Sequence, residues 1–374
     1  MITRLRTGLP FLVAVVLLAA ACARDTTPTA GGGPQAPGAA SAPASNAPSG
    51  APSGASPATP APSTAAPPAE LVPIKVAFSQ VAAAFSPAQL AQDQGLFKKY
   101  GLDAEVAQLP KPSDIQALLS GDVQITIDGS AGIDAIAGGA NLVYVAVPLP
   151  VYTQGLFGQP GLQKVSDLVG TTVGATSQGG SSDYALRTLL TREGVDPAQV
   201  NITYLRDDAG ILAAVQSGAV QAAILTPPNT LRARESGLSE IVNTAALKLR
   251  TINNAIIVRR DYAQQHEDVV LNFLKAYMEA IKELKTNPEV GKATVSKFTR
   301  LTDPALLDES YGIAASTLMI YPLIHDADVQ NVIDMSATPE VKARKPSDYY
   351  DNSYLQKLEG FARALDPQSV AAAQ

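Results

Sequence analysis

The chain of 374 residues contains one cysteine, no tryptophan and only two histidines. A single cysteine excludes an intramolecular disulfide framework and any zinc site built from several cysteines. His266 lies beside an apolar helical stripe and His325 in a loop near Pro322, so a structural role explains each of them. We therefore predict no metal site, no cofactor and no catalytic residues.

An excess of basic residues is also missing. The sequence has 28 Lys and Arg against 34 Asp and Glu, a net charge of −6. Loss of Arg4 and Arg6 with an N-terminal leader would leave 26 against 34, a net charge of −8. Such an acidic chain offers no electrostatic footprint for nucleic acid or for anionic lipid. Nucleic-acid binding is therefore excluded.

Residues 1–21 have the pattern of a secretory signal peptide. Arg4 and Arg6 precede an uncharged apolar run over residues 8–21. This run is shorter than the roughly 20 apolar residues that cross a bilayer, but it fits the apolar region of a signal. Residues 19–22 (AAAC) resemble the lipobox of bacterial lipoproteins, although Ala19 stands where leucine is usual, and this predicts lipidation of Cys22. The alternative is ordinary cleavage that leaves Cys22 as a free thiol.

Residues 22–69 then read as a lipidated N-terminus followed by a disordered linker. From residue 26 to residue 69 there is no charge, no aromatic and no aliphatic side chain larger than alanine. Such a segment cannot bury enough apolar surface to offset its ordering entropy. Its 44 residues would span roughly 35–40 Å as a coil and up to about 135 Å as an extended proline-rich chain. A glycosylated stalk is the alternative interpretation.

From residue 74 onward, short β-rich runs alternate with helical patterns. Strands separated by single helices indicate an α/β fold with parallel sheets. Ser86 is expected to cap a helix that starts at Pro87, and Asp261 to cap one long helix with an apolar face. The predicted strands are 74–78, 102–109, 123–127, 142–147, 172–174, 202–205, 222–225 and 252–258.

One short pattern occurs twice in the chain. Residues 119–124 (LSGDVQ) precede a strand and then Asp128, and residues 216–221 (QSGAVQ) precede a strand and then Thr226. In both places a helix ends at Ser-Gly and the chain turns tightly into a buried strand. Helix–glycine–strand punctuation recurs in any α/β protein, which is one explanation. The other is that the chain forms two similar lobes, each with its own sheet.

Three sequence blocks occur in the same order as in a known family. They are residues 94–103 (QGLFKKYGLD), residues 167–174 (DLVGTTVG) with 177–183 (SQGGSSD), and residues 214–223 (AVQSGAVQAA). Over roughly residues 72–340 the chain resembles the sulfonate, taurine and thiamine-precursor binding proteins of ABC importers, the SsuA/THI5-like (NMT1-like) family. The resemblance implies the type 2 periplasmic-binding-protein fold, with two α/β lobes around a ligand cleft. Lobe 1 would comprise residues 70–155 and 253–374, and lobe 2 residues 156–252.

In open α/β sheets, ligands bind beyond the carboxyl ends of the strands. The loop at residues 177–182 is the best candidate, because its glycines allow close approach and free N–H groups open the following helix. Asp128 would favour an amine or hydroxyl group on the ligand, whereas Arg206 could hold an anion, so the ligand's charge stays open. The candidate ligand-binding residues are Gln80, Asp128, Gly129, Ser130, Ser177, Gln178, Gly179, Ser181, Ser182, Thr226, Pro227 and Asn254.

The resemblance implies an extracytoplasmic, lipid-anchored binding protein that captures a small polar organic solute by hinge closure. The solute would be sulfonate-, carboxylate- or pyrimidine-like, and the implied partners are an ABC permease and its ATPase. We expect a monomer that meets the membrane through its lipid alone. Two alternatives stay open: an enzyme on the same fold, of the thiamine-pyrimidine or menaquinone-pathway type, and a sensory or scavenging lipoprotein without a transporter.

Overall fold

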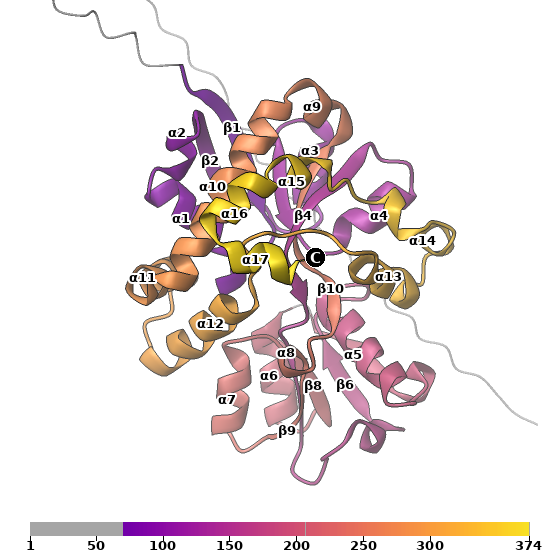
Figure 1. The fold of residues 1–374 in the computed structure, drawn as a ribbon. Coiled ribbons are helices and arrows are strands. Elements are labelled where there is room, and N and C mark those ends of the chain that lie inside the picture. The colour runs from indigo at the N-terminus through magenta and orange to yellow at the C-terminus, as the bar shows by residue number, and fades with distance from the viewer. Residues whose placement is uncertain (1–69, 206, 374) are drawn as a thin grey trace, which may run out of the picture. The chain divides into compact units, whose positions relative to one another are not determined.

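The computed structural model describes residues 70–205 and 207–373. The predicted signal peptide, Cys22, the linker up to residue 69 and Arg206 lie outside the described residues. The described strands form two five-stranded sheets, each flanked by helices (Figure 1). We call the part built on the first sheet lobe 1 and the part built on the second sheet lobe 2.

The first sheet has the strand order β2-β1-β3-β10-β4. Strand β1 pairs in parallel with β2 and β3, whereas β10 runs antiparallel between β3 and β4. The strands are β1 (Val72–Phe78), β2 (Leu102–Gln108), β3 (Ile125–Asp128), β4 (Leu142–Val151) and β10 (Arg250–Arg259). The helices between them are η1 (Ala83–Phe85), α1 (Pro87–Asp93), α2 (Leu96–Lys99), α3 (Ser113–Ser120) and α4 (Ala131–Ala137).

The second sheet has the order β7-β6-β8-β5-β9, and β5 is its antiparallel strand. Its strands are β5 (Gly155–Gly158), β6 (Thr172–Ala175), β7 (Asn201–Tyr204), β8 (Ala222–Leu225) and β9 (Ser239–Asn243). The accompanying helices are η2 (Val165–Leu168), α5 (Ser181–Arg192), η3 (Pro197–Gln199), α6 (Asp208–Gln216), α7 (Asn229–Glu235) and α8 (Thr244–Leu247).

The repeated sequence pattern marks equivalent places in the two sheets. Helix α3 ends at Gly121 and leads into β3, and helix α6 is followed by Gly218 and leads into β8. Both glycines have positive φ values, 86° and 78°, which glycine adopts at low cost. Strands β3 and β8 each occupy the third place in their sheet, beside the antiparallel strand. The interpretation as two similar lobes, each with its own sheet, is therefore confirmed.

The chain crosses between the sheets twice. It leaves the first sheet at the end of β4, passes through residues 152–154 and enters β5, and it returns through β9, α8 and β10. The predicted boundaries of the lobes at residues 155/156 and 252/253 remain a prediction.

The C-terminal part of the chain is helical. Its elements are α9 (Arg260–Gln265), α10 (Glu267–Thr286), α11 (Pro288–Thr299), α12 (Pro304–Thr317), α13 (Asp326–Met335), α14 (Pro339–Lys342), η4 (Pro346–Asp348), α15 (Ser353–Lys357), α16 (Glu359–Leu365) and α17 (Pro367–Ala372). None of the helices in the described residues combines the length and the apolarity that a membrane crossing requires.

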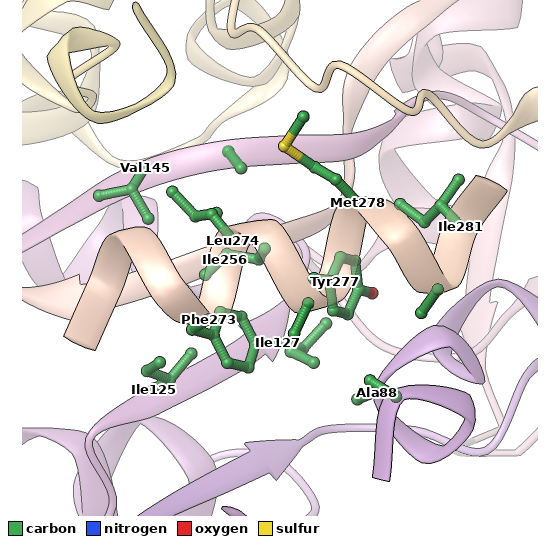
Figure 2. Close-up of a cluster of buried hydrophobic side chains, with 14 of the residues drawn as sticks. Ala88, Ile125, Ile127, Val145, Ile256, Phe273, Leu274, Tyr277, Met278 and Ile281 are labelled. Atoms are coloured by element: carbon green, nitrogen blue, oxygen red, sulfur yellow. The ribbon is translucent and has the colours of Figure 1, made fainter. Parts of the chain in front are cut away.

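Helix α10 carries the centre of the lobe 1 core. Its apolar face packs onto the first sheet, and Figure 2 shows Phe273, Leu274 and Tyr277 lying among strand residues such as Ile127 and Ile256. Phe273 is fully buried, and its ring stacks on Phe97 of α2 with centroids 5.5 Å apart. The helix therefore joins the sheet to the first helices of the chain.

Three sequence expectations about local structure were wrong, and two strands were not predicted. Residues 260–286 form two helices that meet at His266, and Asp261 lies inside the first turn of α9. The Ser86 hydroxyl donates to the carbonyl oxygen of Ala83 and does not cap α1. Strands β5 and β9 were not predicted. Both sheets are mixed, because β10 in the first sheet and β5 in the second each follow a crossing between the sheets and run antiparallel to their neighbours.

We expect Phe273→Ala to lower the free energy of unfolding by about 3–5 kcal/mol, because it leaves a cavity and removes the stacked ring from α2. Leu119→Ala is the control, since Leu119 is 43% exposed and its truncation should change stability by no more than about 0.5 kcal/mol. Urea denaturation followed by circular dichroism measures both. Equal effects of the two substitutions would show that α10 does not anchor the core.

Candidate ligand-binding site

A cavity of about 460 Å³ lies between residues of the two lobes. Its volume is in the range of small-molecule sites, and side chains of both sheets reach it. The lining residues are Ser79, Gln80, Lys111, Asp128, Gly129, Gln154, Thr176, Ser177, Gly180, Ser181, Ser182, Asp207, Asp208, Thr226 and Asn253.

The lining residues follow the carboxyl ends of the strands. Ser79 follows β1, Gly129 follows β3, Thr176 follows β6 and Thr226 follows β8. These strands run in parallel within each sheet, so their carboxyl ends meet at one edge. The cavity therefore occupies the place at which an open α/β sheet holds its ligand.

The two crossing segments also reach the cavity, and both contact the start of α5. The Ser181 hydroxyl accepts from Gln154 Nε2 at 3.0 Å and donates to Asn253 Oδ1 at 2.9 Å. Asn253 Nδ2 in turn donates to the carbonyl oxygen of Val151 at 3.0 Å. A ligand in this cavity would thus lie against the segments that connect the lobes.

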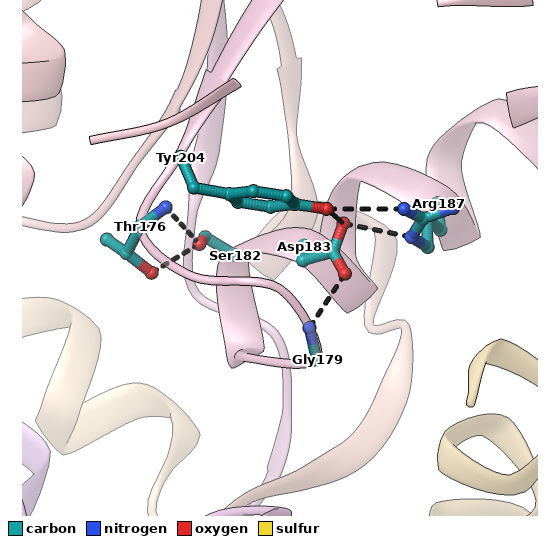
Figure 3. Close-up of polar contacts among 6 residues, drawn as sticks. All are labelled: Thr176, Gly179, Ser182, Asp183, Arg187 and Tyr204. Carbon is teal, nitrogen blue, oxygen red and sulfur yellow. Dashed lines mark hydrogen bonds and ion pairs between the residues drawn. The ribbon is translucent and has the colours of Figure 1, made fainter. Parts of the chain in front are cut away.

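The loop before α5 is held by a network within lobe 2 (Figure 3). Ser182 Oγ accepts from the Thr176 backbone N–H at 2.9 Å and lies 2.6 Å from Thr176 Oγ1. Asp183 is buried; it accepts from the Gly179 N–H at 2.9 Å and from Arg187 Nε at 2.9 Å, and Tyr204 OH donates to it at 3.1 Å. The Asp183 carboxylate therefore stabilises the loop and the first turn of α5.

A charged cluster lines the cavity on lobe 1. Asp128 is fully buried; its Oδ1 atom accepts a hydrogen bond from Ser79 Oγ at 2.7 Å and forms an ion pair with Lys111 Nζ at 2.8 Å. Its Oδ2 atom has no hydrogen-bond partner among the described residues. Behind it lies Asp114, which is also fully buried. Burial, and then the charge of Asp128, raise the pKa of Asp114 to about 6, and a protonated Asp114 can donate to Asp128.

Two further carboxyl groups lie on lobe 2. Asp207 is exposed and caps α6, because its Oδ1 atom accepts from the Gly210 N–H at 2.7 Å. Asp208, the next residue, is the first residue of the helix. Burial raises the pKa of Asp208 to about 6, and hydrogen bonds from Thr226 oppose that rise. The Asp208 Oδ1 atom is buried and unpartnered among the residues described.

The structure brings seven of the twelve predicted ligand-binding residues to the cavity. These are Gln80, Asp128, Gly129, Ser177, Ser181, Ser182 and Thr226. Ser130, Gln178, Gly179 and Pro227 belong to the same loops but do not line it. Asn254 points elsewhere, since its side-chain amide donates to the carbonyl oxygen of Ala84 at 2.9 Å. Successive residues of a strand point to opposite faces of the sheet, so the neighbouring residue Asn253 lines the cavity instead of Asn254.

Sequence reasoning missed eight of the lining residues. Ser79, Thr176 and Gly180 lie within or next to loops that were singled out, so a wider selection from those loops would have included them. Asp207 and Asp208 follow β7 and lie at the start of α6, where helix capping already explains an acidic residue. Lys111 lies in a loop that was not selected, and Gln154 and Asn253 lie in the crossing segments, from which only Asn254 was selected.

We expect Asp114→Asn to change the pH dependence of stability. A raised pKa in the folded state means that the stability contributed by Asp114 is present near pH 4 and is lost as pH rises through about 6. Relative to the unsubstituted protein, the variant should therefore gain about 2 kcal/mol between pH 4.5 and pH 7. Urea denaturation at the two pH values measures this difference. Asp103→Asn, on the exposed surface of β2, controls for the loss of one negative charge, and equal profiles for the two variants would contradict the expectation.

The family model described as NMT1/THI5 like matches residues 82–290. A protein of Brucella abortus (strain 2308) that is named as a binding protein is 25% identical over 298 residues, which cover 77% of this chain and 92% of that protein. The taurine-binding periplasmic protein of Escherichia coli (strain K12) is 29% identical over 249 residues, covering 63% of this chain and 74% of the relative.

Solved structures show the same fold. The periplasmic aliphatic sulphonate binding protein of Escherichia coli superposes with a TM-score of 0.60 at 23% identity, over 70% of this chain and 85% of that chain. The periplasmic nitrate-binding protein of Synechocystis PCC 6803 gives a TM-score of 0.63 at 16% identity, over 80% and 91% of the two chains. At these identities the likeness concerns the fold alone.

Proposed function

The chain belongs to the NMT1/THI5-like family, and from this premise we propose that it is the solute-binding protein of an ABC importer. Its two mixed α/β sheets and the cavity between them are those of the type 2 periplasmic-binding-protein fold. In this proposal it captures a small polar organic solute outside the cytoplasm and delivers it to a permease and its ATPase. The names of the relatives, taurine-binding and sulphonate-binding among them, support this class of function.

The observation that carries the proposal is that residues of both lobes and of both crossing segments line the cavity. Ser181 of lobe 2 is hydrogen-bonded to Gln154 in one crossing segment and to Asn253 in the other. A solute that contacts these groups has different contacts when the lobes move relative to each other. Such a difference in contact free energy is what a ligand needs in order to drive hinge closure.

Two helices of the C-terminal part contact lobe 2 or a crossing segment. Glu309 of α12 accepts from Arg234 Nη1 at 2.5 Å and from Thr230 Oγ1 at 3.2 Å, both on α7 of lobe 2. Asn331 of α13 accepts from Tyr152 OH, in the first crossing segment, at 2.9 Å. Helices α12 and α13 therefore contact lobe 2 and the first crossing segment, which are parts that a hinge motion would move.

The test is small-angle scattering of the full chain with a solute that binds. We expect the radius of gyration to fall when that solute is added, because closure brings the lobes together. Ser177→Leu should abolish both binding and compaction by filling the cavity, without lowering the melting temperature. Ser217→Leu, at an exposed position after α6, is the matched control and should bind normally. A solute that binds without compaction would contradict hinge closure, and intact binding by Ser177→Leu would contradict this site.

An enzyme on the same fold is not favoured by any observation in the site. The relatives that match this chain are named as binding proteins. A binding protein without a transporter shares this structure, and a permease and an ATPase encoded beside the gene would decide for an importer.

The proposal includes export and a lipid anchor at Cys22, based on the signal-like residues 1–21 and on the lipobox-like AAAC pattern. We expect cells expressing the full chain to incorporate labelled palmitate into it, and Cys22→Ser to abolish the label. Ala40→Ser, a substitution of similar size within the linker-like segment, is the control and should keep the label. An exported but unlabelled wild-type protein would mean that it is secreted without an anchor.

A further inference from the structure

The charged groups around the cavity are mainly acidic. Asp128 of lobe 1 and Asp207 and Asp208 of lobe 2 line it, and Asp114 lies directly behind Asp128. Among the described lining residues the single cationic side chain is Lys111, and its ammonium group is already paired with Asp128 at 2.8 Å. A bare anion in this cavity would face an excess of negative charge.

Several polar groups that could bind an anion are already engaged with one another. The Ser181 hydroxyl donates a hydrogen bond to Asn253 Oδ1, and Ser182 Oγ is hydrogen-bonded to Thr176. The start of α5 also has its own carboxylate, Asp183, in the first turn. An incoming anion would have to displace these bonds in order to gain donors of its own.

Carboxylate oxygens without a hydrogen-bond donor, by contrast, come from both lobes. Asp128 Oδ2 belongs to a fully buried side chain, and Asp208 Oδ1 is itself buried. Asp114 can donate a hydrogen bond to Asp128 only in its protonated form. A buried carboxylate oxygen without a donor is unfavourable, and a positively charged N–H group relieves this most effectively.

We propose that the ligand presents a positively charged nitrogen group to this cavity, with Asp128 on lobe 1 and Asp208 on lobe 2 as its recognition residues. This inference rests on the proposed function and specifies the ligand class for the same site. Hinge closure around such a group brings opposite charges together, whereas closure around a bare anion brings like charges together. The carboxylates thereby select for one class of ligand and against the other.

The test uses three probes that share a two-carbon skeleton: 2-aminoethanol (cation), taurine (zwitterion) and isethionate (anion). Each is titrated into the full chain by calorimetry at pH 7.5, next to a thermal-shift screen of larger organic cations, zwitterions and anions. We expect the binders to contain a protonated nitrogen and isethionate not to bind. Asp208→Asn and Asp128→Asn should each weaken the best binder by at least about tenfold, the usual effect of losing a charged hydrogen bond.

Glu235→Gln is the matched control, because it removes one negative charge from an exposed position of α7 that does not line the cavity, and it should leave affinity within about twofold. Since Asp128 also holds Ser79 and Lys111, its variant is interpreted only if its melting temperature is kept. Asp208→Asn does not depend on those contacts and carries the test in that case.

Three outcomes would overturn the inference. One is tighter binding of isethionate or another bare anion, and its loss in Arg206→Gln would assign the cavity to anions. The second is an ammonium ligand that binds Asp208→Asn and the unsubstituted protein equally well. The third is the absence of binding by probes of every charge class, which would also remove the proposed function. In the first two cases ligand-induced compaction would still occur, so failure of the inference is distinguishable from failure of the function.

Discussion

The antiparallel insertion of β10 between β3 and β4 is the constraint on which the site depends. Ala255 pairs with Asp128 in this register, so the end of β3 lies directly beside the crossing segment. The approach is close enough that a Cβ atom on Gly129 would lie 2.9 Å from the carbonyl oxygen of Asn253. The same strand brings Asn253 to Ser181 of lobe 2. One strand pairing thus brings a lobe 1 carboxylate, a crossing segment and the start of α5 together around the cavity.

The sequence was informative where local chemistry decides the structure. Gly121 and Gly218 end the segments that precede β3 and β8, and the repeated Ser-Gly pattern gave two lobes with equivalent sheets. Strand-end loops are also local features, so Asp128, Ser177 and Thr226 could be selected before the structure was known. Their role in binding remains a prediction that the ligand experiments test.

Other features depend on tertiary pairing, which local sequence patterns do not predict. Strand β5 is buried throughout, but its only large side chains are Leu156 and Phe157 between two glycines, and β9 is largely half-exposed, so neither shows a clear strand pattern in the sequence. Both strands are formed through pairing with their neighbours. Asn253 and Asn254 are adjacent and of one type, and only the facing of β10 separates a cavity residue from one that holds the η1 carbonyl of Ala84.

The fold and the charge of the cavity give different kinds of information about the ligand. A shared fold places the site beyond the carboxyl ends of the strands, because parallel pairing brings these ends to one edge of each sheet. It does not fix which side chains stand there, and solved relatives at 16–23% identity are named for ligands as different as nitrate and sulphonates. In this chain Lys111 is neutralised by Asp128, and Asp208 faces the same cavity from the other lobe. Since both lobes contribute acidic groups, the free energy of closure depends on the group that the ligand places between these groups. The charge of the ligand therefore becomes the main property by which the cavity selects it.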